Sequence, residues 1–525
     1  MGPAAFVPGR RSAPWVFWLG TAAVTAGVIL HLPMFIMSAP MGYRMAGMPM
    51  DNGMLAGMAL IVLGILAAGL ALLRPSVAEA PGSPPAWTDI AAQEPKLTLA
   101  HWVLMATITI ALVIDVMKPA TLGFVVPGTI VEYRMTRHSV AVLPFLALTG
   151  TCIGSYVWGV LADRMGRRGA ILLAAVMFIG TSICGAMPTF RWNLAMCFLM
   201  GLSAGGLLPI AYTLLAETIP PRQRGWALVL VGAVGSVGGY LASSTAAALL
   251  EPHFGWRIMW FLGLPTGVML MGLSRFIPES PSFLLLRGEV AEARAVMQRY
   301  RMNLASLPPR PTRATSGGVL LRSPFGLMTL ALNLCAVAWG LVNFGLLLWL
   351  PADLRAAGVG VGASDALLAH AALLALPIAV AATALYHYWS TKWTLVAMSS
   401  VMLAGLVGVS SLGSAVPLHG NMPIVLLTLL VVGTGGMIAV LLPFSAESYP
   451  AAVRGRATGM VAGSSKLGGI LAQVITMAAA VPGLATVALV LALPVVAGAA
   501  LTGRFGTETR GRRLEELDLA MAESD

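Results

Sequence analysis

Three charged side chains lie inside long apolar stretches of this chain, where charges are rare and usually functional. Asp115 and Lys118 share one stretch, and Lys466 lies in another. A buried carboxyl group favours its protonated form, whereas a nearby lysine favours the charged form. We therefore expect Asp115 to bind and release a proton, with Lys118 or Lys466 meeting an anionic group of a ligand. The alternative for Asp115 and Lys118 is a fixed, inert ion pair on one helix.

Further polar side chains in the apolar stretches are candidates to line a binding cavity. His370 is a second group able to titrate near neutral pH, although such a histidine is more often simply hydrogen-bonded within a helix bundle. The others are Asn333, Asn343, Trp339, Tyr212 and Gln473. Ordinary packing between helices is the alternative for each of them. Two lysines against one aspartate leave a surplus positive charge, which an anionic ligand such as a carboxylate would neutralise.

Proline and glycine follow Lys118 closely. Pro119 disfavours helical geometry at Lys118, and the helix is weakened further by Gly123, Pro127 and Gly128. We therefore predict a broken helix, which exposes backbone groups only where it lines a cavity. Close packing or flexing around Lys466 is permitted by Gly459, Gly463, Gly468 and Gly469.

The composition is that of a membrane protein. The chain has 525 residues, of which 58% are hydrophobic and only 10% charged, and its mean hydropathy is +0.84. Soluble domains carry roughly 25% charged residues. The net charge of +11 comes largely from arginines in short loops between apolar stretches, so it indicates topology and excludes a nucleic-acid partner.

Fourteen stretches are long and apolar enough to cross a bilayer, which takes about 20 residues. They are 14–37, 54–73, 99–126, 139–161, 170–188, 192–215, 226–250, 257–276, 326–350, 364–386, 393–413, 423–443, 456–478 and 482–503. The arginine-rich loops all fall on one side, which should be the cytoplasm. Both termini then lie in the cytoplasm, as an even span count requires, and we expect a multi-pass protein of the bacterial inner membrane.

One ten-residue pattern occurs twice, 230 positions apart. It reads Ala-Glu-x-x-Pro-x-x-x-Arg-Gly at 216–225 and again at 446–455. The duplication indicates two related halves, and in membrane proteins such halves usually form a transporter with its site between them. A second motif, Gly-Val-Leu-Ala-Asp-Arg-Met-Gly-Arg-Arg, occupies 159–168 between two spans.

The 159–168 motif resembles the signature loop of the major facilitator superfamily. The duplicated pattern is similar to that of its sugar-porter and metabolite:proton symporter branches. Two segments add to the resemblance: Pro-Glu-Ser-Pro-Ser-Phe-Leu at 278–284 and Gly-Thr-Glu-Thr-Arg-Gly at 506–511. The resemblance implies twelve core helices in two six-helix bundles that work by alternating access. The two spans before residue 99 are then an N-terminal addition to that core.

The resemblance also implies a cytoplasmic gate of charge networks that hold the outward-open state. Its residues would be Gly159, Asp163, Arg164, Gly166, Arg167, Arg168, Glu217, Arg224, Glu447 and Arg454. The second half should carry another signature loop, but 386–393 reads Tyr-His-Tyr-Trp-Ser-Thr-Lys-Trp and lacks the acidic residue and the arginine pair. We therefore expect an asymmetric gate.

The expected domains follow from the spans and the motifs. They are an N-terminal two-helix extension at 1–75, a cytoplasmic linker at 76–98, bundles at 99–276 and 326–503, a cytoplasmic segment at 277–325 between the bundles, and a cytoplasmic tail at 504–525. The four cysteines lie in or beside apolar stretches and behave as packing residues. No nucleophile–base set and no metal-ligand spacing is present, so we expect neither an enzyme nor a cofactor nor a metal site.

Methionine is concentrated at the front of the chain. Eight methionines follow His31 within residues 34–58. Thioethers are ligands for soft metals such as Cu(I), although methionine more commonly fills irregular apolar positions.

We predict a fourteen-helix secondary transporter of a small polar or anionic metabolite, coupled to protons and monomeric. The alternatives are an exporter of drugs or of a soft metal such as copper, and a membrane sensor that kept the fold without transporting.

Overall fold

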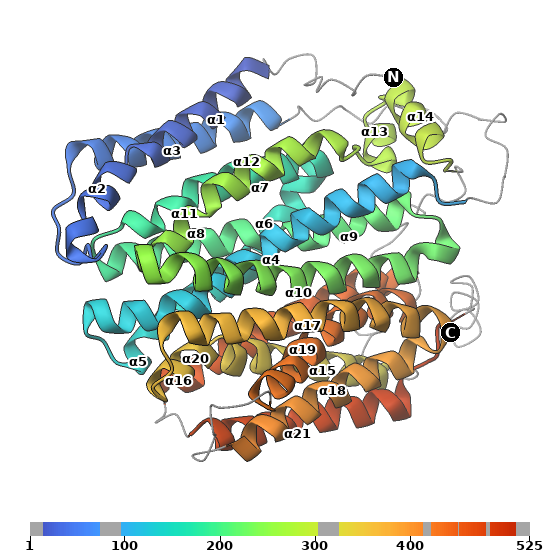
Figure 1. Cartoon of the computed structure of the whole chain (residues 1–525). Helices are drawn as coiled ribbons and strands as arrows, with labels where there is room; N and C mark the ends of the chain where they lie inside the picture. Colours follow the sequence, from blue (N-terminus) through green and yellow to red (C-terminus); the bar gives the residue numbers. More distant parts are fainter. Residues whose placement is uncertain are drawn as a thin grey trace. The chain divides into compact units, whose positions relative to one another are not determined.

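The computed structural model describes residues 14–73, 96–302, 325–412, 422–449, 451–478 and 483–510. Within these ranges the chain forms helices and no strand (Figure 1). Thirteen helical stretches there are long and apolar enough to cross a membrane. The remaining expected span, 456–478, corresponds to α20 (Ala451–Ala478), whose 28 residues also suffice in length. The helical fold is confirmed, and the helices described are consistent with fourteen spans.

The chain divides into two compact units. Unit 1 comprises 1–119, 149–224 and 250–309, and unit 2 comprises 120–148, 225–249 and 310–525. These units do not coincide with the bundles expected at 99–276 and 326–503, whose boundaries stay a prediction. Most of the expected linker at 76–98, residues 303–324 of the expected segment between the bundles and most of the expected tail lie outside the described residues.

The N-terminal spans form a tight hairpin in unit 1. It consists of α1 (Pro14–Ile29), α2 (Leu32–Met37), the short turn η1 (Ala39–Met41) and α3 (Asn52–Leu72). A methyl group added at Gly20 would stand 2.6 Å from the carbonyl oxygen of Gly64, and one at Gly57 2.7 Å from that of Gly27. Only glycine permits α1 and α3 to approach so closely, because their backbones are in direct contact.

The helices that follow the hairpin run from residue 99 to 299. They are α4 (Leu99–Tyr133), α5 (Arg137–Val140), α6 (Val142–Met165), α7 (Arg167–Gly180), η2 (Thr181–Ala186), α8 (Phe190–Ala204), α9 (Leu207–Thr218), α10 (Pro221–Phe254), α11 (Ile258–Phe261), α12 (Gly263–Leu273), η3 (Ser274–Phe276), α13 (Pro281–Leu286) and α14 (Val290–Arg299). Polar side chains cap several of them: Ser280 Oγ accepts from the amide of Phe283 at 3.3 Å at the start of α13.

The predicted break at Lys118 is wrong, because α4 is continuous over 35 residues and passes through both Pro119 and Pro127. Membrane helices tolerate proline where neighbouring groups satisfy the backbone that it disturbs. Proline has no amide hydrogen, so Pro119 cannot donate the usual helical bond to the carbonyl of Asp115. The local effect of Pro119 is therefore a changed hydrogen-bond ladder beside Asp115, without an end to the helix.

The C-terminal helices belong to unit 2. They are α15 (Gly326–Val342), η6 (Asn343–Leu347), α16 (Leu350–Ala356), α17 (Val361–Tyr388), α18 (Thr391–Leu412), α19 (Met422–Ser448), α20 and α21 (Leu484–Phe505). Helix α15 packs against both α20 and α21. The short helix η6 is a π-helical turn, a distortion that is frequently found at functional sites.

Candidate functional site

A carboxylate caps the start of α7 in unit 1. Glu279 Oε1 accepts hydrogen bonds from the amides of Arg167 at 2.6 Å, Arg168 at 3.4 Å and Ser280 at 3.0 Å. The negative charge sits where the amides and the dipole of a helix N-terminus favour an anion. Gly166 has a φ of 89°, and any side chain there would collide with the Glu279 carboxylate. Glycine is therefore required at position 166 for two reasons: the backbone has a positive φ, and the Glu279 carboxylate leaves no room for a side chain.

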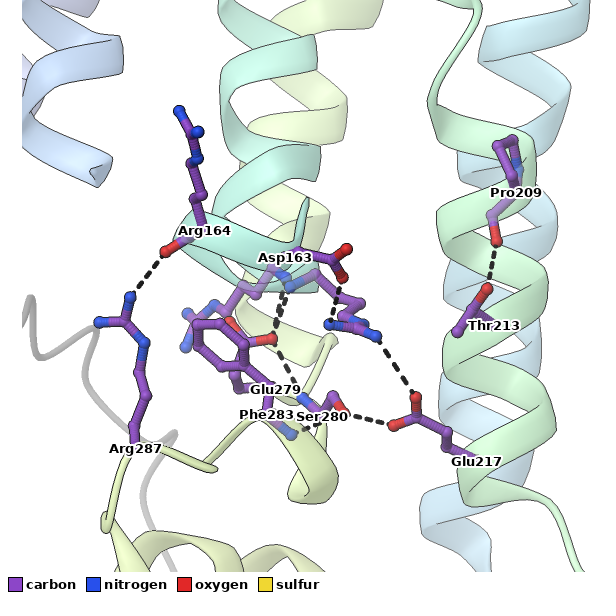
Figure 2. A network of polar contacts seen from close by, with 11 residues as sticks. Asp163, Arg164, Pro209, Thr213, Glu217, Glu279, Ser280, Phe283 and Arg287 are labelled. Atoms are coloured by element: carbon purple, nitrogen blue, oxygen red, sulfur yellow. Dashed lines mark hydrogen bonds and ion pairs between the residues drawn. The ribbon is translucent and has the colours of Figure 1, made fainter. Parts of the chain in front are cut away.

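Arg167 links the signature loop to the first copy of the duplicated pattern. Its guanidinium lies 3.6 Å from Asp163 Oδ1 and 3.7 Å from Glu217 Oε1. Glu217 is only 7% exposed and also accepts a hydrogen bond from Ser280 Oγ, whereas Asp163 is 77% exposed. Figure 2 shows how these side chains converge from three separate segments of unit 1. The charge of Arg224 acts on Glu217 as well.

Two other residues of the implied gate contribute differently. Arg164 accepts through its carbonyl oxygen a 2.8 Å hydrogen bond from Arg287 Nη2, and its own side chain is directed away from Glu217 (Figure 2). A Cβ added at Gly159 would meet nothing within 4 Å. Arg167 is therefore the arginine of this loop that bridges the two carboxylates.

Unit 2 repeats the cap at the start of α18. Glu508 accepts hydrogen bonds from Ser390 Oγ, from the Thr391 amide at 3.0 Å, from Thr391 Oγ1 at 2.6 Å and from the Arg510 amide at 3.0 Å. Burial alone would raise the pKa of Glu508, but the hydrogen bonds from Ser390 and Thr391 hold it below its ordinary value. Glu508 belongs to the tail segment that resembles a family motif, as Glu279 belongs to the segment after α12.

In the second copy of the duplicated pattern, two hydroxyl groups contact Glu447. Glu447 Oε2 accepts from Tyr386 Oη at 2.7 Å and from Thr509 Oγ1 at 3.0 Å. Arg454 donates from Nε to the carbonyl of Tyr449 at 3.1 Å. Tyr386, which donates to Glu447, belongs to the 386–393 segment, and Arg167, which lies beside Glu217, belongs to the signature loop. The asymmetry of the gate stays a prediction.

Several predicted binding residues come together where α15, η6 and α20 meet. Lys466 is half-buried, with Nζ 5.8 Å from the centre of the Phe344 ring. Ser464 donates to Asn333 Oδ1 at 2.7 Å. The Trp339 ring lies edge-on to Phe344, with ring centres 5.7 Å apart. A cation, an amide and two aromatic rings therefore line one interface of unit 2.

The same interface continues through Gln473 and Asn343. Gln473 is fully buried, donates to the carbonyl of Phe344 at 2.6 Å, and accepts from Trp349 Nε1 at 3.3 Å. Asn343 begins the π-helical turn that carries Phe344. Of the remaining candidates, His370 is exposed on α17, and Tyr212 lies on α9 in unit 1.

Asp115 and Lys118 are both buried in α4. The ammonium group of Lys118 donates to the carbonyl of Phe178 at 2.8 Å and to Thr181 Oγ1 at 2.9 Å. It also lies 4.6 Å from the centre of the Phe178 ring. Asp115 is one of the charged groups that act on Lys118. These contacts hold the Lys118 ammonium against the end of α7 within unit 1.

The structure adds a polar cluster that the sequence analysis missed. Arg137, in α5, pairs with Asp353, in α16, and its guanidinium lies 4.4 Å from the centre of the Trp349 ring. The neighbouring His138 is 2.9 Å from the carbonyl of Thr476, in α20. We call Arg137, His138, Asp353 and Trp349 the α5–α16 latch. Arg137 and Asp353 lie at the ends of spans, where charged residues are common, so the sequence did not single them out. Only the tertiary contacts show that they pair.

Metal ligands of the usual kind do not gather in the parts of the chain that the structure describes. No group of three or more His, Cys, Asp and Glu side chains there could hold a metal ion.

Comparisons with known proteins agree with this architecture. Residues 104–473 match the model of the Major Facilitator Superfamily. The niacin transporter NiaP of Acinetobacter baylyi is 27% identical, over 80% of this chain and 97% of its own length. The gallate transporter of Pseudomonas putida is 27% identical, over 55% of this chain and 65% of its own. The structure of the proton:xylose symporter XylE of E. coli superimposes with a TM-score of 0.63 at 18% identity, covering 80% of this chain and 98% of XylE.

Proposed function

Because this chain belongs to the major facilitator superfamily, we propose that it moves a small anionic metabolite, a carboxylate, across the membrane together with protons. It is a multi-pass membrane protein, and its named relatives are transporters of small molecules. Niacin and gallate, the compounds in those names, are both aromatic carboxylic acids. The proposal for this chain rests mainly on the surroundings of one cation, Lys466.

Lys466 supplies the charge that an anion requires in an apolar setting. An ionisable side chain inside a span usually marks a substrate or ion pathway. Phe344 offers a ring beside it, Trp339 packs edge-on against Phe344, and Asn333 is already oriented by Ser464. This combination suits an aromatic carboxylate, whose ring would stack while its carboxylate meets the lysine.

Asp115 is our candidate for the proton. It is buried and shares α4 with Lys118, whose ammonium is held by Phe178 and Thr181. Of the two lysines, we therefore assign substrate contact to Lys466 and an anchoring role to Lys118. His370, Asn343 and the gate residues of the two glutamate clusters remain part of the proposal as predicted from the sequence.

Transport by alternating access requires contacts at both ends that break in turn. We propose that the cluster of Asp163, Arg167 and Glu217, with Glu447 in the second half, closes the cytoplasmic end. The α5–α16 latch would close the other end. From the arginine-rich loops we propose that both termini lie in the cytoplasm and that the membrane is a bacterial inner membrane. We also propose that the protein acts as a monomer.

Uptake into proteoliposomes tests the proposal. Benzoate, niacin and gallate, each radiolabelled, would be supplied with and without an imposed proton gradient, and an organic cation of similar size would serve as a counter-example. We expect gradient-driven accumulation of at least one acid and none of the cation. Lys466→Met should abolish uptake at low substrate concentration. The matched control is Lys392→Met, because Lys392 is also half-buried beside an aromatic ring, 5.1 Å from the centre of Trp393.

A second variant separates coupling from binding. Asp115→Asn should eliminate the response to the proton gradient while exchange of substrate across the membrane persists. Uptake of the cation in place of the acids would refute the assignment of Lys466. An unchanged gradient response in Asp115→Asn would reduce Asp115 to a structural partner of Lys118.

A further inference from the structure

The N-terminal hairpin buries a histidine at its turn. His31 lies between α1 and α2, and its side chain is 0% exposed. The imidazole lies against Gly57 of α3, where a Cβ would stand only 2.7 Å from His31 Cε1. Glycine at this position of α3 therefore leaves the room that the ring occupies.

The two nitrogens of the His31 ring have different surroundings. Nδ1 is 2.7 Å from the carbonyl oxygen of Gly27, and a carbonyl only accepts, so the proton lies on Nδ1. Nε2 is buried and has no hydrogen-bond partner among the described residues. In the neutral ring, Nε2 then carries an unshared electron pair in a buried position, and the charge of Asp51 acts on the ring. A histidine that binds metal is typically oriented by this kind of bond from its other nitrogen to a backbone carbonyl.

Buried methionines occur in the parts of the hairpin that follow this histidine. Met34, Met45 and Met54 are at most 5% exposed. Met34 follows His31 by about one turn in α2, and Met54 precedes Gly57 by about one turn on the same face of α3. Met45 lies in the loop that joins these helices. The helix α2, the loop and the helix α3 that follow His31 in the hairpin therefore each contain a buried methionine.

We propose that His31 Nε2 and the thioethers of Met34, Met45 and Met54 form a binding site for a soft monovalent metal ion, Cu(I). Thioether and imidazole ligands select Cu(I), whereas Mg²⁺ and Ca²⁺ require oxygen ligands. A metal bond would also satisfy the buried Nε2, which otherwise carries the cost of a lost hydrogen bond. Two further methionines, Met37 and Met41, are 70% and 49% exposed and provide soft ligands at the surface from which the ion enters.

The site is independent of the proposed transport function. It lies wholly within the hairpin, before residue 104, where the family match begins. Loss of carboxylate uptake would therefore leave this inference intact, and loss of metal binding would leave the transport proposal intact.

Metal titration of the full-length protein in nanodiscs tests the site. Ag(I), which does not change oxidation state here, would be titrated by calorimetry, and Cu(I) would be measured in competition with a chromophoric chelator. We expect about one equivalent of either ion, with affinity at least tenfold lower in His31→Gln and in Met45→Leu with Met54→Leu. X-ray absorption at the copper edge should show both sulfur and nitrogen ligands.

The controls are matched in residue type. Met37→Leu with Met41→Leu changes two exposed methionines of the same hairpin, and His253→Gln changes an exposed histidine of α10. Both controls should keep the affinity of the unaltered protein. Leucine conserves the volume of methionine. The variant with Met45→Leu and Met54→Leu therefore tests metal binding even if His31→Gln misfolds. Absence of binding by the unaltered protein, or equal affinity in the buried pair, would overturn the proposal.

Discussion

Glu279 and Glu508 each place a carboxylate on the backbone amides that begin a helix. They are 229 positions apart, close to the 230 that separate the duplicated patterns. The residue after each glutamate, Ser280 or Thr509, donates to the glutamate of the duplicated pattern in the same half. The internal duplication therefore includes a carboxylate cap and a hydroxyl link to a buried glutamate.

Removing the cap of α7 should destabilise unit 1. Glu279→Ala takes away the acceptor for the amides of Arg167 and Arg168, at a cost of about 0.5–2 kcal/mol. Glu279→Gln keeps an acceptor oxygen and should lose less. Thermal unfolding in detergent measures the difference, with the exposed Glu292→Gln on α14 as the control. Equal midpoints for Glu279→Ala and the control would show that the cap is dispensable.

The cap of α18 should respond to acid. The pKa of Glu508 is lowered in the folded protein, so its stabilising effect is complete above the ordinary value of 4.5 and is lost as pH falls through the lowered value. The unfolding midpoint of the unaltered protein should exceed that of Glu508→Gln by a constant margin near neutral pH. The margin should shrink below about pH 4.5. A margin that widens in acid would contradict this, because it would mean that the folded protein favours the protonated form of Glu508.

Two helices of this chain differ in how far they depart from regular α-helical geometry. Helix α4 passes through two prolines without ending, whereas α15 gives way to the π-helical turn η6 at Asn343. The turn carries Phe344 into contact with Gln473 and Lys466 of α20. The distortion that we expected beside Asp115 thus occurs instead in the helix that packs against Lys466.

The α5–α16 latch can be tested by reversing its charges. Arg137→Asp or Asp353→Arg alone places like charges together, and the double variant restores an opposite pair. We expect a coupling of about 0.5–3 kcal/mol. The readout is the rate at which a membrane-impermeant maleimide labels Thr476→Cys, in a protein whose Cys152 is replaced by serine. Each single change should speed labelling, and the double change should slow it again.

If the double variant is labelled as fast as either single variant, Arg137 and Asp353 do not act as a pair. Arg355→Gln supplies a comparison, because Arg355 pairs with Asp365 of α17 at 3.0 Å and takes no part in the latch.

At the level of the whole molecule, the number of spans determines where the termini lie. Thirteen spans would place them on opposite sides of the membrane, and fourteen would place them on the same side. Fusing a cytoplasm-dependent fluorescent protein to either end should give fluorescence in both cases. Alkaline phosphatase, active only outside the cytoplasm, should be inactive at both ends. Opposite behaviour of the two ends would mean an odd number of spans. Either α20 or one of the two N-terminal helices would then not cross the membrane.

The sequence by itself determined the class of molecule, because repeated apolar runs of about 20 residues are the length that crosses a bilayer. The span positions, the family and the two-fold repeat follow from hydropathy and motif spacing, which are local properties of the chain. Lys466, Asn333, Trp339 and Gln473 could also be singled out, since polar groups in apolar spans are costly.

Only the tertiary structure decided which of these groups meet. It places Lys466 beside the Phe344 ring, and it shows that the Lys118 ammonium donates hydrogen bonds to Phe178 and Thr181. It made Arg167 the bridge between Asp163 and Glu217, and it paired Arg137 with Asp353, although 216 positions separate them. Such contacts depend on how helices rotate and pack, and no single helix encodes the rotation of its neighbours.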